Sequence, residues 1–165
     1  MIAQKGVWMS VLGELVNYNK LNPRQKEIYN FQRVSALFAE YGYTTIKLSD
    51  DWMGADFLAI SFDGNRTLKV QLKGRLTFEK KYQSKDIFIC FNDKSESSWY
   101  LYPHDILLKK YLPKFKNTKS WNKDDGKYHF PTLTAEARVM LEKYRLWIIK
   151  EDLSDHLIVK RLELL

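Results

Sequence analysis

Hydrophobic and polar residues alternate along a segment near the middle of the chain. Residues 67–73 alternate strictly between aliphatic and polar side chains, which is typical of a half-buried strand. Residues 55–62 form an apolar, aromatic-rich run that predicts a second strand. The sequence Asp63-Gly64-Asn65 between them contains residue types that tolerate positive φ. The pattern therefore predicts a β-hairpin.

This hairpin would bring three polar side chains together at one end. If its turn is centred on residues 63–64, Asp56 lies opposite Gln71, and if it is centred on residues 64–65, Asp56 lies opposite Lys73. Side chains alternate along a strand, and directly opposed residues share a face. Either turn, or a four-residue loop, therefore places the three side chains on one face. A three-residue loop or a bulge would separate them.

The aspartate and the Gln-x-Lys sequence after the turn form a motif that resembles the PD-(D/E)XK nuclease superfamily. Residues 54–59 (Gly-Ala-Asp-Phe-Leu-Ala) and 70–73 (Val-Gln-Leu-Lys) carry the match. The motif is similar to the branch with Gln-x-Lys, which includes Mrr-related restriction enzymes and one type of intron-encoded homing endonuclease. The resemblance implies an α/β (α+β) mixed sheet with a restriction-endonuclease-like αβββαβ core and extra C-terminal elements.

The resemblance also implies a chemistry, the metal-dependent hydrolysis of DNA. Asp56 would be the anchoring ligand of Mg²⁺ or Mn²⁺, because hard cations prefer oxygen ligands. Gln71 would offer its amide oxygen and Leu72 its backbone carbonyl. Lys73 would hold the attacking water or stabilise the charge that develops on the phosphate. Glutamine in place of glutamate removes one negative charge, which should weaken metal affinity.

A helix is expected to precede the hairpin. Asn22 followed by Pro23 predicts its start, and Gly42 predicts its end. Families of this type often carry a glutamate on the first helix that reaches the metal site. Glu27 fits that type, although it lies farther from the helix end at Gly42 than in the usual pattern. Gln32 is better placed but has the wrong chemistry. Alternatively, Glu27 only favours the positive N-terminus of the helix.

Further elements follow from shorter patterns. Asp50 and Asp51 are expected in a loop before the hairpin, where they are a second choice for a metal ligand. Strands are predicted at 43–48, 86–91, 99–102, 146–149 and 157–159, helices at 7–16, 103–111 and 135–144, and loops at 49–54 and 92–98. The apolar clusters in 146–165 could pair with each other or with a second copy of the chain.

Charge favours an anionic partner. The chain has a net charge of +7 and a pI of about 9.3, which favours nucleic acid, although a basic surface can also serve solubility alone. Aromatic residues interleave with lysines over residues 109–123, a mixture that suits phosphate contact with the aromatic residues as stacking or packing anchors. The expected nucleic-acid contacts are Arg75, Lys80, Lys81, Lys85, Lys114, Lys116 and Lys119.

Other features limit the function classes. The single cysteine, Cys90, is expected to be a small buried hydrophobe, and its solitude suits a reducing compartment such as the cytoplasm. The three histidines are scattered, so they predict no metal site. No run is long and apolar enough to span a membrane. One domain is expected over 1–165, with a core at about 22–112 and a C-terminal extension at 113–165.

Two functions fit these observations. The first is a metal-dependent DNA endonuclease that acts as a homodimer or higher homo-oligomer, since cutters of duplex DNA usually pair two sites. The second is a nuclease-fold protein that binds nucleic acid or another protein without cutting. Without the resemblance, Asp56, Gln71 and Lys73 are also what any half-exposed hairpin would show.

Overall fold

One mixed β-sheet forms the centre of the protein, of which the computed structural model describes residues 11–147. The strands are β1 Tyr43–Trp52, β2 Ala55–Ser61, β3 Thr67–Lys73, β4 Thr77–Glu79, β5 Ile87–Asp93, β6 Ser98–Pro103, β7 Lys127–His129 and β8 Arg145–Leu146. Six of them lie in the order β1-β2-β3-β5-β6-β8, and β4 pairs with β7 in a separate small sheet. Within the large sheet, β3 and β5 are parallel and the other neighbours are antiparallel.

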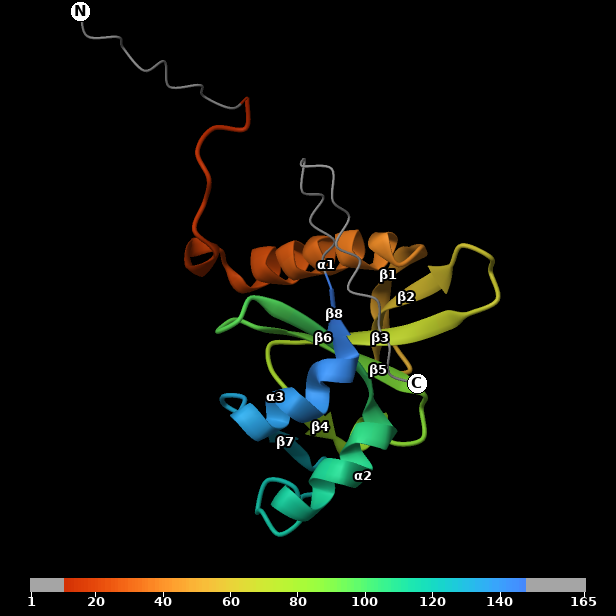
Figure 1. Cartoon of the computed structure of the whole chain (residues 1–165), viewed down its shortest axis with the longest axis vertical. Coiled ribbons are helices and arrows are strands. Elements are labelled where there is room, and N and C mark those ends of the chain that lie inside the picture. Colours follow the sequence, from red (N-terminus) through yellow and green to blue (C-terminus); the bar gives the residue numbers. More distant parts are fainter. Residues whose placement is uncertain (1–10, 148–165) are drawn as a thin grey trace, which may run out of the picture.

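Helices cover both faces of the large sheet (Figure 1). The α-helices are α1 Pro23–Glu40, α2 His104–Phe115 and α3 Ala135–Leu141, and the 3-10 helices are η1 Tyr18–Lys20, η2 Lys80–Tyr82 and η3 Glu142–Tyr144. α1 crosses one face, and α2 and α3 lie on the other with the β4–β7 sheet (Figure 1). The predicted fold class, a mixed α/β sheet flanked by helices, is confirmed.

The first helix begins at the predicted residues. The Asn22 side chain accepts a hydrogen bond from the Gln25 N–H, and the Gln25 side chain accepts one from the Asn22 N–H, each at 2.9 Å. This reciprocal capping satisfies two backbone donors that the first turn leaves free, and Pro23 has no N–H to satisfy. Gly42 follows the helix with φ of +74°, a conformation that glycine adopts without strain.

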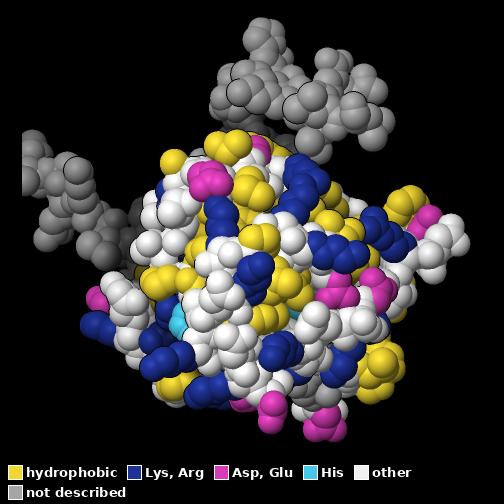
Figure 2. Space-filling model, turned by 90° about the horizontal axis from the view of Figure 1, so that it is seen from below, with side chains coloured by type: hydrophobic (Ala, Val, Ile, Leu, Met, Phe, Trp, Pro, Cys, Tyr) yellow, Lys and Arg dark blue, Asp and Glu magenta, His cyan; other side chains and the backbone are white. Residues whose placement is uncertain are grey.

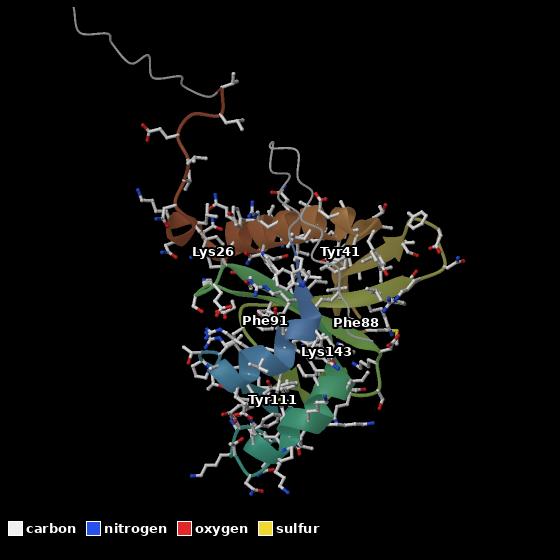
Figure 3. All side chains as sticks on the ribbon, in the orientation of Figure 1. Lys26, Tyr41, Phe88, Phe91, Tyr111 and Lys143 are labelled. Carbon is white, nitrogen blue, oxygen red and sulfur yellow. The ribbon has the colours of Figure 1, made fainter. Side chains whose placement is uncertain are left out.

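Two hydrophobic cores lie on opposite faces of the sheet. The core beneath α1 includes Val34, Leu37, Phe38, Phe57, Val70 and Trp99. In the other core, Phe91 of β5 and Tyr111 of α2 are both buried between the sheet and the helices (Figure 3). Phe115, Trp121 and Leu141 belong to this second core, so the described part of the C-terminal extension packs on the same sheet as the predicted nuclease core.

The hairpin has the register that the turn centred on residues 63–64 predicts. Phe57 pairs with Val70, so the next position along each strand sets Asp56 opposite Gln71. A four-residue loop closes the hairpin, with the Ser61 N–H donating to the Arg66 carbonyl at 2.9 Å. The four-residue loop therefore keeps the motif side chains on one face of the hairpin, as the motif requires.

The segment before the hairpin differs from the prediction. Residues 49–54 were expected to form a loop, but β1 extends to Trp52, which pairs with Ala55 after an irregularity that begins at Lys47. The turn is reduced to Met53 and Gly54, with φ of +54° and +93°. Asp50 and Asp51 therefore lie in a strand rather than in a loop. Their polar character had masked the strand, because acidic residues are depleted in strands.

The connection between the parallel strands also departs from an αβββαβ order. It contains β4 and η2 where that order has an α-helix, and the next α-helix, α2, follows β6. α2 extends four residues beyond the predicted end at residue 111 to Phe115. α3 ends at Leu141 and continues as a 3-10 turn to Tyr144, so the predicted helix 135–144 is divided in two.

Several expected elements differ from the structure. No helix forms over residues 11–16, where the apolar side chains are exposed. The strand at 146–149 is described only to Leu146, and the predicted strand at 157–159 lies outside the described residues, as does His156. Among the described residues, no helix combines the length and apolar character needed to cross a membrane.

Candidate active site

The motif residues meet where several strands end. Lys73 is the last residue of β3, which is parallel to β5, so the carboxyl ends of both strands lie at one edge of the sheet. β2 runs antiparallel to β3, so Asp56 at its start lies at the same edge. The N-terminal half of α1 faces this edge, because Glu27 and Asn30 line a cavity with Asp56 and Lys73.

Three predicted metal ligands lie within hydrogen-bonding distance of one another. Asp56 Oδ2 accepts from the Gln71 Nε2 amide at 2.6 Å and from the Leu72 backbone N–H at 2.8 Å. The same Gln71 nitrogen lies 3.4 Å from the Leu72 carbonyl oxygen. The carboxylate, the amide and the backbone carbonyl therefore converge, as the register requires.

The amide of Gln71 tests whether these residues fit a cation. Gln71 is 8% exposed, and its Oε1 atom is buried without a hydrogen-bond partner among the described residues. Its NH₂ group faces Asp56 and the Leu72 carbonyl, which is the orientation that two oxygen acceptors favour. A rotation of the amide by about 180° would turn Oε1 toward the same two oxygens, an arrangement that only a cation stabilises. The oxygen chemistry therefore fits a hard divalent cation.

The charge at this position is low for a metal centre. Among residues 11–147, no cluster of three or more His, Cys, Asp or Glu side chains is arranged to hold a metal ion. Asp56 supplies the only formal negative charge within the Asp56–Gln71–Leu72 group. A cation bound there would depend on neutral oxygens and water for most of its coordination.

Lys73 forms a close ion pair with a residue that the sequence did not suggest. Its Nζ atom lies 2.6 Å from Glu79 Oε1, and the side chains are 21% and 13% exposed. Nζ also lies 5.1 Å from the ring centre of Tyr82. Lys81, an expected nucleic-acid contact, shares Glu79 at 3.7 Å. Glu79 lies six residues beyond the motif on β4, and no pattern in the sequence linked it to Lys73.

A cavity of about 140 Å³ joins the site to α1. It is lined by Glu27, Asn30, Asp56, Leu72, Lys73, Gly74 and Trp99. Glu27 therefore faces the same space as Asp56, whereas Gln32 is exposed and does not contribute to it. Asp50 is exposed and does not line it either.

Glu27 is already paired in this arrangement. Its carboxylate accepts from Lys47 Nζ at 2.9 Å and from Arg24 Nη1 at 2.9 and 3.1 Å. These partners, Lys47 first, hold the pKa of Glu27 below its usual range in spite of its partial burial. Glu27 thus stays ionised near neutral pH, and its charge is shared with two cations.

A second, larger cavity of about 340 Å³ adjoins the first. Its lining residues are Tyr18, Tyr29, Asn30, Arg33, Lys73, Gly74, Asn92, Lys94, Ser97 and Trp99. Arg33 and Lys94 were not among the expected nucleic-acid contacts. A three-residue spacing from Glu27 through Asn30 to Arg33 along the predicted helix could have suggested Arg33.

The expected nucleic-acid contacts are scattered over the opposite layer. Lys80 donates to the Lys123 carbonyl at 2.8 Å, and Lys114 pairs with Glu136 at 2.9 Å. Lys85 is half-buried, and its carbonyl accepts from Lys69. Arg75, Lys116 and Lys119 are exposed. Basic side chains are dispersed over this side of the molecule rather than gathered in one patch (Figure 2).

The aromatic side chains of residues 109–123 cannot stack on nucleotides. Tyr111, Phe115 and Trp121 are 0%, 1% and 6% exposed and belong to the hydrophobic core. Phe115 stacks on Tyr128 with ring centres 4.6 Å apart. Of the two roles expected of these aromatic residues, stacking is therefore wrong, and they are packing anchors on the buried side of the segment.

The single cysteine is buried, as the sequence predicted. Cys90 is fully buried, and burial raises the pKa of its thiol, so it is inert. His104 is buried, and burial lowers the pKa of its imidazole. Its Nε2 atom accepts from the Glu79 N–H at 3.3 Å, and its Nδ1 atom lies 2.9 Å from Asp105. His129 is exposed.

Comparisons with known proteins give a distant structural similarity. No family model matches the chain, and no curated protein matches its sequence. A solved structure of a bacterial homing endonuclease, I-Ssp6803I, aligns with 75% of this chain and 86% of its own at 16% identity and a TM-score of 0.44.

Proposed function

We propose that this protein is a metal-dependent endonuclease that hydrolyses phosphodiester bonds in DNA. The observation that carries the proposal is the convergence of Asp56, the Gln71 amide and the Leu72 carbonyl beside Lys73. Asp56, Leu72 and Lys73 line a cavity in which a phosphate could reach them, and the buried Gln71 amide lies against Asp56. The nuclease-like motif and a net charge of +7 point to the same substrate class.

Each group has a distinct role in this proposal. Asp56, Gln71 and the Leu72 carbonyl would hold Mg²⁺ or Mn²⁺, which would polarise the phosphate and lower the pKa of a bound water. Lys73 lies in the same cavity and would stabilise negative charge that develops on the phosphate. Glu27 borders this cavity and would lend a second negative charge to the cation-binding side.

A second function has its own support. The Lys73 ammonium is held by Glu79, and Gln71 supplies no charge, so the site could bind a DNA strand without cutting it. In that protein, Lys73 and the basic residues of the neighbouring cavity would contact phosphates, and no cation would be required. The two functions differ in their dependence on a divalent metal.

The test compares cleavage of supercoiled, linear and branched DNA of long, diverse sequence with Mg²⁺, Mn²⁺ or EDTA. The variants are Asp56→Asn and Lys73→Ala, and the matched controls are Asp63→Asn in the exposed hairpin loop and Lys127→Ala on the surface. The proposal expects metal-dependent cutting that both site variants abolish and both controls retain. Salt-sensitive DNA binding without cutting by any of the proteins would instead identify a binding module. Light scattering on the protein with and without DNA would test the homodimer that paired cuts require.

A further inference from the structure

We infer that the larger cavity binds a phosphate of the nucleotide next to the bond that is cut. This inference rests on the proposed function, because it assigns the neighbouring subsite of the same DNA strand. Asn30, Lys73, Gly74 and Trp99 line both cavities, so the two spaces form one continuous depression. A strand whose phosphate lies at Asp56 and Lys73 would pass directly into it.

The charges of the two cavities differ. The smaller cavity has the carboxylates Glu27 and Asp56 on its wall, which suits a cation. The larger cavity is lined by Arg33, Lys73 and Lys94 and, within the described part of the chain, by no acidic side chain. The larger cavity therefore complements an anion. Because it opens onto the smaller cavity, that anion would belong to the same DNA strand as the phosphate at Asp56.

The two cations outside the motif have no carboxylate partner within residues 11–147. Arg33 makes no ion pair there, and the Lys94 ammonium lies over the Tyr18 ring at 4.8 Å from its centre. Lys26, labelled near the start of α1 in Figure 3, lies over the same ring at 5.7 Å. The ring attracts both ammonium groups without neutralising them. Arg33 and Lys94 thus keep a full charge for a phosphate.

Helix α1 connects the two subsites. Glu27, Asn30 and Arg33 are spaced by three residues, so they follow one stripe of the helix. Glu27 lies at the smaller cavity, Asn30 lines both, and Arg33 lies at the larger one. The six steps from Glu27 to Arg33 cover about 9 Å along the axis. The helix therefore runs along the depression from its acidic to its basic end.

The experiment measures DNA binding by fluorescence anisotropy in EDTA, with a labelled 20-nucleotide single strand and the matching duplex, over a range of NaCl concentrations. The double variant Arg33→Ala/Lys94→Ala is compared with Lys127→Ala/Lys143→Ala, which removes the same charge from exposed positions on β7 and η3. The inference expects the cavity variant to lose about tenfold in affinity and to lower the slope of log K against log salt by about 0.7 to 0.9, as one lost phosphate contact would. The control should change affinity less than about twofold.

The outcomes separate this inference from the proposed function. An unchanged cavity variant, or equal losses in both variants, would overturn the subsite and leave only general electrostatic attraction. If the wild-type protein cuts none of the tested DNA, the cleavage proposal fails, and the binding comparison still decides the subsite. Where cleavage occurs, the cavity variant should raise KM while kcat changes little, because Arg33 and Lys94 lie away from Asp56. The comparison of single strand with duplex shows which form of DNA the depression accepts.

Discussion

The amide of Gln71 limits how strongly the candidate site can hold a cation. Its Oε1 atom is buried without a partner among the described residues, and its NH₂ group donates to Asp56 at 2.6 Å. The present orientation therefore satisfies Asp56 and leaves the amide oxygen unsatisfied, which costs roughly 1–3 kcal/mol for a buried acceptor. If the amide rotated and Oε1 bound a cation beside Asp56, part of this cost would be recovered, because Oε1 would then have a partner.

Gln71→Glu should lower the stability of the metal-free protein and raise its affinity for a divalent cation. The new carboxylate would face Asp56 at the distance of the present hydrogen bond, and like charges that close raise the pKa of one partner. In EDTA we expect unfolding free energy to fall by about 1–3 kcal/mol, with a deficit that grows as the pH rises and both groups ionise. With Mn²⁺ the affinity should rise about tenfold, because a charged oxygen replaces a neutral one.

Thermal melts over a Mn²⁺ titration measure both effects, since a ligand that binds only the folded state raises Tm. Gln71→Met is the matched control, because it keeps a similar volume and has no oxygen ligand. Its Tm should not respond to Mn²⁺. Equal responses of the glutamate and methionine variants would place the cation elsewhere.

Glu79 acts in this structure as a positioning residue for Lys73. The pair is 2.6 Å apart and mostly buried, so Glu79→Gln should release the ammonium and lower the unfolding free energy by about 1 kcal/mol. If Lys73 stabilises charge on the phosphate, kcat should fall about tenfold with little change in KM, because the lost interaction forms only as the charge develops.

Lys81→Ala is the control for this change. Lys81 contacts the same carboxylate at a longer distance of 3.7 Å and is exposed, so its loss should alter kcat less than about twofold. A Glu79→Gln variant with reduced stability and unchanged kcat would show that the ion pair only supports the fold.

The sequence could predict the motif side chains but not their partners. Asp56, Gln71 and Lys73 share a face because of the register of one hairpin, and that register depends only on neighbouring residues and on the length of a short loop. The link from Lys73 to Glu79 depends on where β4 lies after the chain leaves the sheet. Arg33 and Lys94 line one cavity because α1 shares a core with β5 and β6, and local patterns carry no such information.

At the scale of elements, the strongest local signals were the most accurate. α1 has a proline start, a capping box and a glycine end, and the hairpin has strict alternation around a turn. The β4–β7 sheet escaped prediction because each of its strands has three residues. Residues 11–16 have helical spacing but no surface in the described chain on which to pack, and most helical stability comes from such packing.

Arg138 links α3 to the hairpin formed by β5 and β6 through ion pairs and a hydrogen bond. Its Nε atom lies 3.0 Å from Asp93 and 2.9 Å from Glu96, and its Nη2 atom donates to Ser95 at 2.7 Å. Burial acts to raise the pKa of Asp93, but hydrogen bonds from Ser95 and Arg138 outweigh it and lower that pKa. Arg138→Ala should therefore lower the unfolding free energy by about 1–2 kcal/mol at pH 7.

This loss should depend on pH in a definite direction. A carboxyl whose folded pKa is lowered stabilises the protein above its ordinary pKa, and the stabilisation disappears as the pH falls through the folded value. Urea unfolding at pH 7, 5 and 3 should therefore show the full difference at the first two values and a smaller one at pH 3. Lys114→Ala breaks the exposed pair that joins α2 to α3 and should cost less than about 0.5 kcal/mol. A pH-independent loss from Arg138→Ala would point to its packing instead.

At the scale of the whole molecule, one sheet supports two separate cores. α1 covers one core and α2 and α3 the other, and strands β2, β3, β5 and β6 contribute side chains to the cores. The candidate site lies at the sheet edge between them, with Glu27 and Asn30 from the first layer and Glu79 beside the second. The geometry of the site therefore depends on both layers being folded.

A shared sheet predicts that the two layers unfold together. Leu37→Ala in the α1 core and Leu107→Ala in the α2 core remove the same side chain from buried positions, 7% and 0% exposed. Each should lower the unfolding free energy by about 2–5 kcal/mol and shift one common transition. The prediction is tested with urea unfolding followed by far-ultraviolet circular dichroism and by tryptophan fluorescence, whose midpoints should coincide in both variants.

Separate transitions would contradict a single domain over the described chain. If Leu107→Ala moved only one of two midpoints, the α2 layer would be an independent unit attached to a smaller nuclease-like core, as a division near residue 112 would suggest. The expected result is the opposite, because β8 of the C-terminal extension pairs with β6 and Phe115, Trp121 and Leu141 fill the core of the central sheet. Removing that packing should loosen the edge at which Lys73 and Glu79 meet, so a loss of cooperativity would be accompanied by a loss of the site.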